Sequence, residues 1–474
     1  MADLRDWLRE VEKREELKTI EGAGWDLDIG FLTAYYWKQW RDAPNLLFDK
    51  IPGYPPGFRV MSNVIMTPKH FARAFGLSEK ASDKEMMAAV RQRMPEWEAK
   101  AKDFAPRVVK SGPVMENVVS GDAVDLERFP SPKWHELDGG RYLGTGCAVI
   151  TQDPDTGEVN LGCYRNMVLD KKTVGLEVAP GKHGRLHYEK YHARGKPCPV
   201  AISIGHHPLY FALAGVEFPL PEYLLYGAIT GKPAEVIQEE VTGLPIPADS
   251  EMVIVGWCPP GQVRPEGPFG EYTGYYASKG KREPFVVVER VYYRNNPIIL
   301  GAPPGRPPNG FSYLHALMRS LVLESDLRKS GIPDIVGVWT HDSPGYLFIT
   351  ISIKQRYAGH AKQVGLAARH LVRTGLGARY IVVVDDDIDV TSISDVLWAL
   401  TTRSDPEKHI DILRRVRSTS LDPMIRKPAE SFHNSTAIIE ACRPYEWMSE
   451  FPEAVEFSPG IEKKMMAKWG KVLP

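Results

Sequence analysis

The chain has 474 residues, of which 43% are hydrophobic and 25% charged, and its formal net charge at pH 7 is −1. At roughly 150 residues per domain, this length and composition predict about three domains of an ordinary globular protein. The balanced charge gives no electrostatic reason to expect nucleic acid or an anionic membrane as a partner. No apolar run approaches the ~20 residues of a membrane span. The five cysteines contain no C-x-x-C pair, so we expect a protein of the reducing cytoplasm.

The predicted elements change in character along the chain. Residues 1–115 carry helical patterns, beginning with a charged amphipathic helix that places Leu4, Trp7, Leu8 and Val11 on one stripe. Residues 116–325 hold short β-rich runs between Gly/Pro turns, including the hairpin signal TQDPDTGEV, and predict a largely antiparallel sheet or barrel. Residues 326–440 alternate strand and helix patterns, which indicates an α/β domain. Residues 441–474 end in a short basic amphipathic helix that could pack on its own chain or on a neighbouring subunit.

Two glutamates, Glu266 and Glu271, frame the segment EGPFGE. On a straight strand, side chains five residues apart would point to opposite faces. Gly267, Pro268 and Gly270 favour a bend instead. A bend can bring both carboxylates to one cavity, where their pKa values would move apart and make an acid/base pair. From the local sequence alone, a hairpin with both charges facing water is the favoured alternative.

Asn160 and Arg165 lie in the apolar run VNLGCYRNMVL. On one strand they would begin on opposite faces unless Gly162 introduces a bulge. A buried guanidinium needs carboxylate partners, because an unpaired charge is costly to bury, and Glu266 and Glu271 are candidates for that role. An arginine at a strand end that reaches water is the open alternative.

A second group of polar residues could bind a metal ion. His183 and His187 are spaced i, i+4, as in some helical metal sites, but no H-E-x-x-H motif accompanies them. A solvated helix is the favoured interpretation of His187 and His192. Glu222 is isolated in an apolar stretch and either protrudes or binds something, because a lone buried glutamate is rare. Asn160, His183 and Glu222 would make an oxygen/nitrogen site suited to Mn²⁺ or Mg²⁺, although spacing alone does not assemble them.

An acidic run, DDDID at residues 385–389, follows a predicted strand. It is similar in composition to an acidic metal-binding loop. The chain has no P-loop and no G-x-G-x-x-G motif. We therefore favour a structural role, in which the acids end the strand and cap the following helix.

Several longer motifs resemble the UbiD family of prenylated-flavin-dependent decarboxylases. These are NLGCYR, PGKHGRLHYEKYHARG, EYLLYGAITG, EGPFGEYTGYY and VDDDIDVTSISDVLWALTTR, and they agree with the family in order and spacing over most of the chain. The resemblance implies a mixed α+β fold with an N-terminal α+β domain, a central split β-barrel that holds the cofactor, and a C-terminal α/β domain with a terminal helix. It also implies a homodimer or a higher homo-oligomer such as a hexamer.

The resemblance also assigns roles to individual residues. Arg165, Glu266 and Glu271 match the family's Glu-Arg-Glu catalytic network, with Glu271 as proton donor. Asn160, His183 and Glu222 match the ligands of Mn²⁺ (or Mg²⁺) at the cofactor phosphate, and K⁺ is implied nearby. Lys182 stands where the family's ferulic acid decarboxylases carry Gln, and Arg373 matches a phosphate-binding lysine of that branch. The implied contacts to prenylated FMN are Asn160, Leu161, Gly162, Cys163, Tyr164, Arg165, Lys182, His183, Glu222 and Arg373.

The activity implied by the resemblance is the reversible, non-oxidative decarboxylation of an aromatic, heteroaromatic or α,β-unsaturated carboxylic acid through a covalent prenylated-FMN adduct. Its partners would be that acid, CO₂ or bicarbonate, and a flavin prenyltransferase that supplies the cofactor. Two alternatives belong to other classes: an FMN-dependent reductase or electron-transfer flavoprotein, and a cofactor-free subunit of a decarboxylase complex. The sequence does not indicate which acid is the substrate.

Overall fold

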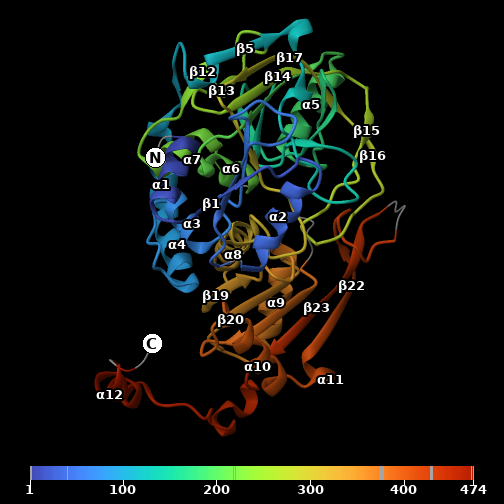
Figure 1. Ribbon diagram of the computed structural model, residues 1–474. Coiled ribbons are helices and arrows are strands. Elements are labelled where there is room, and N and C mark those ends of the chain that lie inside the picture. Colours follow the sequence, from blue (N-terminus) through green and yellow to red (C-terminus); the bar gives the residue numbers. More distant parts are fainter. Residues whose placement is uncertain are drawn as a thin grey trace.

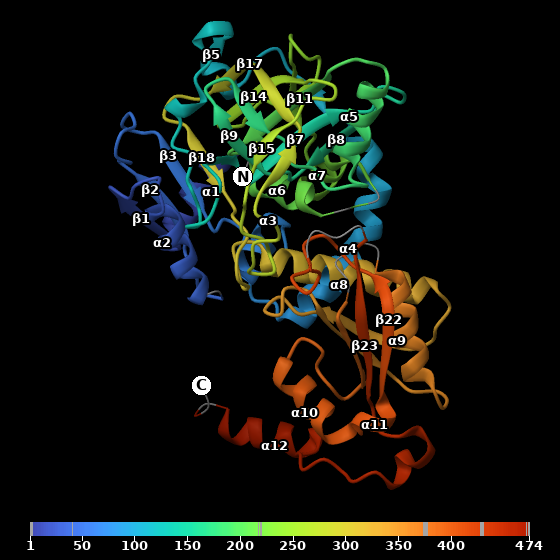
Figure 2. The same cartoon turned by 90° about the vertical axis from the view of Figure 1, so that its right-hand side faces the viewer.

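The computed structural model describes residues 3–39, 41–216, 218, 220–372, 378–426, 431–470 and 472. The N-terminal and central segments form one body, and an α/β layer lies below it. The tail after β23, which ends in α12, extends away from that layer (Figures 1 and 2). Among the described helices, none is long and apolar enough to cross a membrane. The predicted mixed fold class is confirmed.

The N-terminal segment packs helices around a four-stranded sheet in the order β1-β2-β3-β18. Asp3 caps α1 by accepting a hydrogen bond from the Asp6 N–H, and α1 buries Leu4, Trp7 and Val11, as its sequence stripe predicts. β18 comes from much later in the chain and pairs in parallel with β3. The bounds are α1 Leu4–Lys13, β1 Leu17–Glu21, α2 Asp28–Tyr36, β2 Asn45–Asp49, β3 Arg59–Ser62, α3 Pro68–Ala74, α4 Asp83–Lys100 and β18 Ile298–Gly301.

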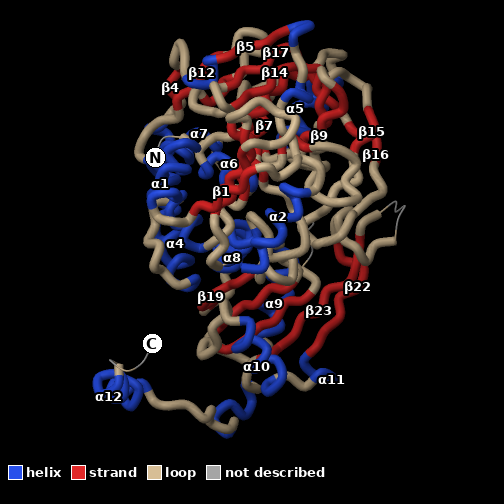
Figure 3. Tube along the Cα trace, in the orientation of Figure 1, coloured by secondary structure: helices blue, strands red, loops and turns tan. Residues whose placement is uncertain are grey.

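The central segment forms a nine-stranded, curled sheet in the order β6-β9-β10-β17-β14-β11-β7-β8, with β5 paired to β17 (Figure 3). The predicted hairpin joins β7 to β8 in antiparallel register. Every residue of β11 is buried, so this strand lies inside the body. The sheet strands are β5 Asn117–Ser120, β6 Tyr142–Gly144, β7 Cys147–Gln152, β8 Val159–Gly162, β9 Asn166–Asp170, β10 Thr173–Gly175, β11 Cys198–Ile204, β14 Met252–Cys258 and β17 Phe285–Tyr293.

Three helices and two small sheets complete this segment. α5 packs against β7 and β8, and α6 packs against the same two strands and against α7. The helices therefore cover the edge of the curled sheet where β8 ends. The bounds are α5 His183–Ala193, α6 Pro208–Gly215, α7 Glu222–Thr230, β4 Arg107–Val108, β12 Glu235–Gln238, β13 Pro245–Pro247, β15 Arg264–Glu266 and β16 Lys281–Glu283.

The C-terminal segment has a five-stranded sheet in the order β19-β20-β21-β23-β22, parallel across β20, β21 and β23. α8 packs on β19 and α9 of this layer and also contacts α3 and α4, so it connects the layer to the N-terminal segment. We keep the predicted domain limits at residues 115, 325 and 440 as a proposal. The bounds are α8 Ser312–Lys329, β19 Ile335–Thr340, β20 Phe348–Ile353, α9 His360–Leu371, β21 Tyr380–Asp385, α10 Ile393–Arg403, α11 Pro406–His409, β22 Ile410–Arg417, β23 His433–Ala441 and α12 Pro459–Trp469.

The acidic run begins at Asp385, the last residue of β21, and has a structural role. The acids do not cap the following helix as expected, because the N-cap of α10 is Ser392, which accepts a hydrogen bond from the Asp395 N–H. Arg403, near the end of α10, donates from Nη1 to Asp385 at 3.0 Å and from Nη2 to Asp387 at 2.8 Å. Arg403 and Asp385 are both buried. The acids therefore fix α10 to the end of β21 and satisfy a buried guanidinium.

Candidate active site

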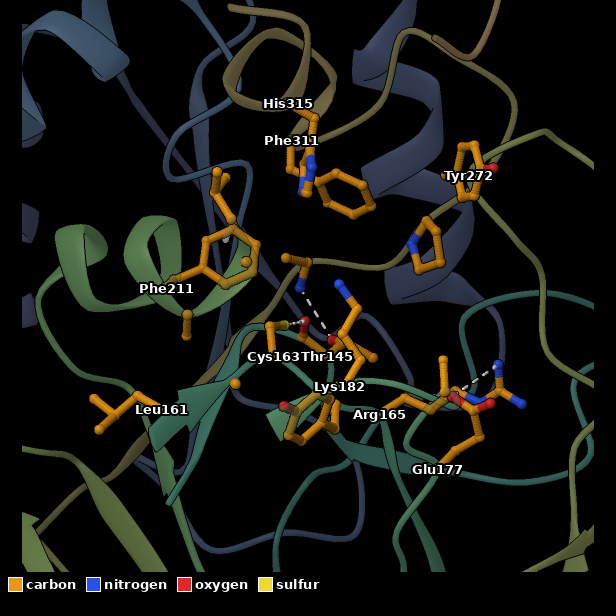
Figure 4. Close-up of a pocket in the computed structure, with 18 of the residues that line it drawn as sticks. Thr145, Leu161, Cys163, Arg165, Glu177, Lys182, Phe211, Tyr272, Phe311 and His315 are labelled. Carbon is orange, nitrogen blue, oxygen red and sulfur yellow. Dashed lines mark hydrogen bonds and ion pairs between the residues drawn. The ribbon is translucent and has the colours of Figure 1, made fainter. Parts of the chain in front are cut away.

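A cavity of about 560 Å³ lies between the edge of the curled sheet and α8 (Figure 4). It contains every described residue that the family resemblance selects except Glu266, which contacts Arg165; Arg373 lies outside the described residues. The selected residues in the lining are Asn160, Leu161, Gly162, Cys163, Tyr164, Arg165, Lys182, His183, Glu222 and Glu271. Segments far apart in the sequence thus meet at one place.

Arg165 bridges the two glutamates of EGPFGE. Its Nε and Nη2 donate to the two carboxylate oxygens of Glu266 at 2.9 and 2.8 Å, and its Nη1 donates to Glu271 Oε1 at 2.7 Å. Glu266 is 1% exposed and Glu271 9%. The prediction that a bend brings both carboxylates to one place is confirmed, and the solvated hairpin is wrong. Since Arg165 is itself half-buried beside them, the open alternative of an arginine reaching into water is also wrong.

Local geometry explains how the three side chains meet. β15 ends at Glu266, and the chain turns so that the Glu271 N–H donates to the Tyr275 carbonyl at 3.0 Å. Gly139 packs against this turn, and a Cβ on Gly139 would lie only 2.0 Å from the Gly267 carbonyl oxygen. On the other side of the cavity β8 ends at Gly162. Arg165 therefore leaves the sheet, and it reaches the cavity that Asn160 also lines.

Burial and two neighbouring charges determine the pKa of Glu271. Burial raises the pKa of Glu271 to about 7, with Arg165 lowering it and the charge of Glu177 raising it. Glu177 Oε2 lies 4.0 Å from Arg165 Nη1. Burial alone would raise the pKa of Glu177, but Arg165 and Lys281 more than offset that effect and hold it below its usual value. Glu271 can thus carry or release a proton near neutral pH while Glu177 stays ionised.

The candidate metal ligands lie at another end of the cavity. Asn160 is on β8, while His183 and Glu222 are the first residues of α5 and α7. Glu222 Oε2 accepts the Leu161 N–H at 3.0 Å, and burial raises the pKa of Glu222 to about 7. The Tyr164 hydroxyl accepts hydrogen bonds from the Gly184 N–H at 3.2 Å and from the Asn160 amide at 3.4 Å.

This end fits a divalent cation bound to a phosphate. Within the described residues, no three His, Cys, Asp or Glu side chains gather as a metal site. The trio instead offers an amide, an imidazole and a carboxylate, a donor set that suits Mn²⁺ or Mg²⁺ completed by phosphate oxygens. A cation would also offset the burial of Glu222, and the first N–H groups of α5 and α7 favour an anion nearby. Lys182 projects into the same cavity (Figure 4).

Several cavity residues are not indicated by any sequence motif. Glu177 follows β10, His315 and Arg319 lie on α8, and Tyr346 precedes β20. Aromatic side chains also line the walls, which suits a planar ring system such as a flavin. The aromatic lining residues are Tyr164, Phe211, Phe218, Phe269, Tyr272, Phe311 and Tyr346. Three of these aromatic residues lie in the motifs quoted above, Tyr164 in NLGCYR and Phe269 and Tyr272 in EGPFGEYTGYY, and the other four lie outside them.

The expectation that His187 and His192 lie on a solvated helix is wrong. His187 is buried rather than solvated, and its Nδ1 lies 2.9 Å from the Thr151 hydroxyl of β7. His192, one turn later, is half-buried and lies 3.1 Å from the Cys258 carbonyl. Both side chains bind α5 to the sheet. The face of α5 that carries them packs against the sheet and is not open to solvent.

Comparisons with known proteins identify the same family over most of the chain. Models of 3-octaprenyl-4-hydroxybenzoate carboxy-lyase match at residues 8–90 for its N-terminal domain, 107–307 for its Rift-related domain and 312–441 for its C-terminal domain. A pyrrole-2-carboxylic acid decarboxylase from Pseudomonas aeruginosa is 34% identical over 80% of this chain and 78% of its own. The chain belongs to the UbiD family. The family resemblance drawn from its motifs is thereby confirmed.

Solved structures of UbiD-family enzymes share the architecture. Vanillic acid decarboxylase from Sedimentibacter hydroxybenzoicus, in its closed form, gives a TM-score of 0.85 at 29% identity and covers 100% of this chain and 99% of its own. The UbiD-class enzyme HmfF from Pelotomaculum thermopropionicum, in complex with FMN, gives 0.84 at 25% identity over 98% and 100%. An evolved dimeric form of HmfF in complex with prFMN gives 0.80 at 25% identity over 99% and 100%.

Proposed function

We propose that this UbiD-family protein is a prenylated-FMN-dependent carboxy-lyase that reversibly removes CO₂ from an aromatic, heteroaromatic or α,β-unsaturated carboxylic acid. The observation that carries the proposal is the buried bridge of Arg165 between Glu266 and Glu271 at the wall of an aromatic-lined cavity. The similarity to HmfF, solved with FMN and with prFMN, supports the cofactor class. The similarity to decarboxylases of pyrrole-2-carboxylic and vanillic acids supports the reaction.

In this proposal Asn160, His183 and Glu222 would hold Mn²⁺ (or Mg²⁺), whose charge would offset that of the cofactor phosphate, and Lys182 would add a positive charge. Removing CO₂ from an sp² carbon leaves an unstable carbanion, and prenylated FMN, when bound, supplies the electron sink that this requires. A flavin prenyltransferase would provide the cofactor. A potassium ion near the phosphate stays a prediction.

The protein's own residues then supply orientation and a proton. Glu271, with its pKa raised to about 7 by burial, is the general acid that protonates the carbon from which CO₂ departs. Its ionised form serves the reverse carboxylation, in which the same proton must be taken up. Arg165 fixes the orientation of Glu271, and Glu266 fixes Arg165 through two parallel hydrogen bonds. The aromatic walls keep water from the reacting carbon.

Glu271→Gln tests the proposal. Glutamine keeps the size and a hydrogen bond to Arg165 but cannot donate the proton. Enzyme co-expressed with a flavin prenyltransferase would be assayed for CO₂ release and for deuterium uptake from heavy water. We expect turnover to fall at least ~100-fold, the usual contribution of a general acid, with flavin and metal content unchanged. Glu289→Gln, at an exposed position of β17, is the matched control. Near-normal turnover by Glu271→Gln would contradict the assignment.

We also infer a homodimer or a higher homo-oligomer. Apolar side chains remain exposed on α10 and α12, and the C-terminal segment extends away from the rest of the chain (Figure 1). Exposed apolar surface of this kind is common at subunit interfaces. The exposed side chains are Ile393, Leu397 and Trp398 on α10, and Ile461, Met465, Met466 and Trp469 on α12. Light scattering on the purified full chain measures the assembly directly.

A further inference from the structure

Two of the five cysteines lie beside each other at the edge of the cavity. Cys147 is the first residue of β7, and Cys163 is the first residue after β8. The Cys163 thiol donates to the Thr145 carbonyl at 3.4 Å (Figure 4), and the Cys147 thiol donates to the Tyr164 carbonyl at 3.2 Å. Each thiol is thus hydrogen-bonded to the backbone that flanks the other cysteine. This exchange holds the two side chains close together.

The two thiols also interact with each other. The hydrogen bond between them, together with burial, raises the pKa of Cys147 well above its usual value, and the same bond lowers the pKa of Cys163. The strand register agrees with this contact, because β7 and β8 pair up to Val149 and Gly162. If that spacing is continued, the Cα atoms of the two cysteines lie roughly 6 Å apart, within the range that a disulfide spans.

The two thiols differ in access. Cys163 is half-buried and lines the cavity, whereas Cys147 is 0% exposed. A small oxidant that enters the cavity therefore meets Cys163 first, and the lowered pKa of this thiol favours its reactive thiolate form. An accessible cysteine next to a protected one is the arrangement of a redox sensor, in which the second thiol resolves the oxidation product of the first.

Another cysteine pair lacks this access. Cys198 and Cys258 lie directly opposite each other on β11 and β14. Both are 0% exposed, and neither is among the residues that line the described cavity. Burial raises the pKa of both thiols, that of Cys258 to about 12. This pair is therefore protonated and closed to solvent, so closeness of two thiols alone does not make them reactive.

We propose that Cys147 and Cys163 are a modification site at which a hydroperoxide forms a disulfide when the cavity is empty. The Cys163 sulfur attacks one oxygen of hydrogen peroxide, the O–O bond breaks and water leaves, which gives a sulfenic acid. The Cys147 sulfur then attacks the Cys163 sulfur, the S–O bond breaks, and a second water leaves with the Cys147 proton. The two thiols lose two electrons and two protons, and the peroxide is reduced to two waters.

The disulfide would act on the segment that builds the site. It would remove both thiol donors, and with them the hydrogen bonds to the carbonyls of Thr145 and Tyr164. This segment runs from Asn160, a candidate metal ligand, to Arg165, which binds Glu271. Oxidation should therefore weaken the binding of metal and flavin, and a bound flavin should protect the thiols. This consequence rests on the proposed function, whereas the chemistry of the two thiols does not.

Peptide mass spectrometry of the full chain tests the disulfide. The flavin-free protein is reduced, freed of reductant, treated with hydrogen peroxide and capped with iodoacetamide. Trypsin leaves both cysteines in one peptide, residues 142–165, and cleavage after Glu158 separates them. We expect this peptide to lose the mass of two hydrogen atoms, and its two pieces to part only after reduction. The number of free thiols should fall from five to three, since one pair is consumed.

Single substitutions assign the role of each sulfur. In Cys147→Ala the reaction should stop at a sulfenic acid on Cys163, which dimedone labels. In Cys163→Ala the Cys147 thiol should stay free. Cys442→Ala, at a buried position just after β23, is the matched control and should form the disulfide as the wild type does. A thermal melt shows that each variant is folded, and the wild-type peptide decides the inference if one is not.

Three results with the wild type would overturn the inference. The pair could stay reduced under excess peroxide, Cys163 could be oxidised only to a sulfinic or sulfonic acid, or the bond between Cys198 and Cys258 could form first. Each would show that the two thiols at the cavity do not react with each other.

Titration with FMN in the presence of Mn²⁺ measures the consequence for the site. We expect the oxidised protein to bind FMN about 10- to 100-fold more weakly than the reduced protein, the usual effect of disturbing groups that orient metal ligands. Dithiothreitol should restore binding, and FMN added before peroxide should slow disulfide formation. Equal affinities of the two forms would overturn the effect on the site. If neither form binds FMN, the proposed function fails, and the peptide masses alone decide whether the disulfide forms.

Discussion

The charge of Glu177 raises the pH at which Glu271 changes its charge, in addition to the larger effect of burial, so Glu177→Gln should move that pH downward. Arg165 Nη1 lies 4.0 Å from Glu177 Oε2 and 2.7 Å from Glu271 Oε1, so these two oxygens are at most about 6.7 Å apart. At that distance two charges repel by ~2.5 kcal/mol at an effective dielectric constant of 20 and by ~0.6 kcal/mol in water. Removing the charge should therefore lower the pKa of Glu271 by about 0.5 to 1.8 units. Lys281, released from its pair with Glu177, would act in the same direction.

The pH dependence of kcat reports this change. A general acid must be protonated to act, so kcat should be constant below about pH 7 in the wild type and fall as the pH rises through the pKa of Glu271. In Glu177→Gln the falling limb should begin at lower pH, while the plateau at acidic pH keeps its height. Glu289→Gln, at the exposed position on β17, should leave the limb unmoved. A limb that stays in place in Glu177→Gln, or moves to higher pH, would refute the electrostatic reasoning.

Two further substitutions test other parts of the site. His183→Ala should lower both the metal content and the flavin absorbance of the purified protein; full retention of both would show that His183 is not a ligand. Gly139→Ala should lower turnover by ~10-fold or more, because its Cβ would meet the Gly267 carbonyl oxygen at 2.0 Å and displace the turn that holds Glu271. Gly460→Ala on α12, with nothing within 4 Å of the added Cβ, is its control, and equal activity of the two variants would count against this account.

Much of the fold follows from local pattern. The stripe of α1, the hairpin between β7 and β8, and the strand and helix runs of the C-terminal layer were all readable, because period and turn residues are local properties. Burial was harder to predict. His187 has the sequence surroundings of a solvated helix, yet it is buried because β7, some 35 residues earlier, covers it. Its environment depends on tertiary packing that no window around the helix contains.

The proposed catalytic residues, Arg165, Glu266 and Glu271, illustrate the same limit at the site. EGPFGE by itself favours a solvated hairpin. Burial of its two carboxylates requires Arg165, about 100 residues earlier, whose charge and hydrogen bonds offset the cost of removing them from water. Family motifs supplied that pairing, since they preserve the order of distant segments. They did not supply Glu177, His315 or Arg319, because these lie outside the motifs and enter the cavity through the placement of α8 and of the segment after β10.

The pairing of β18 with β3 has a consequence for how the chain is made. β3 ends at Ser62, but its parallel neighbour begins at Ile298, so ribosomes must add about 240 residues before that edge can be covered. At ~5–20 residues per second, the edge of the N-terminal sheet waits for roughly 10 to 50 s during synthesis. An unpaired edge strand is a template for wrong pairing. The first segment of this protein therefore completes its sheet only after most of the cavity-lining residues have been synthesised.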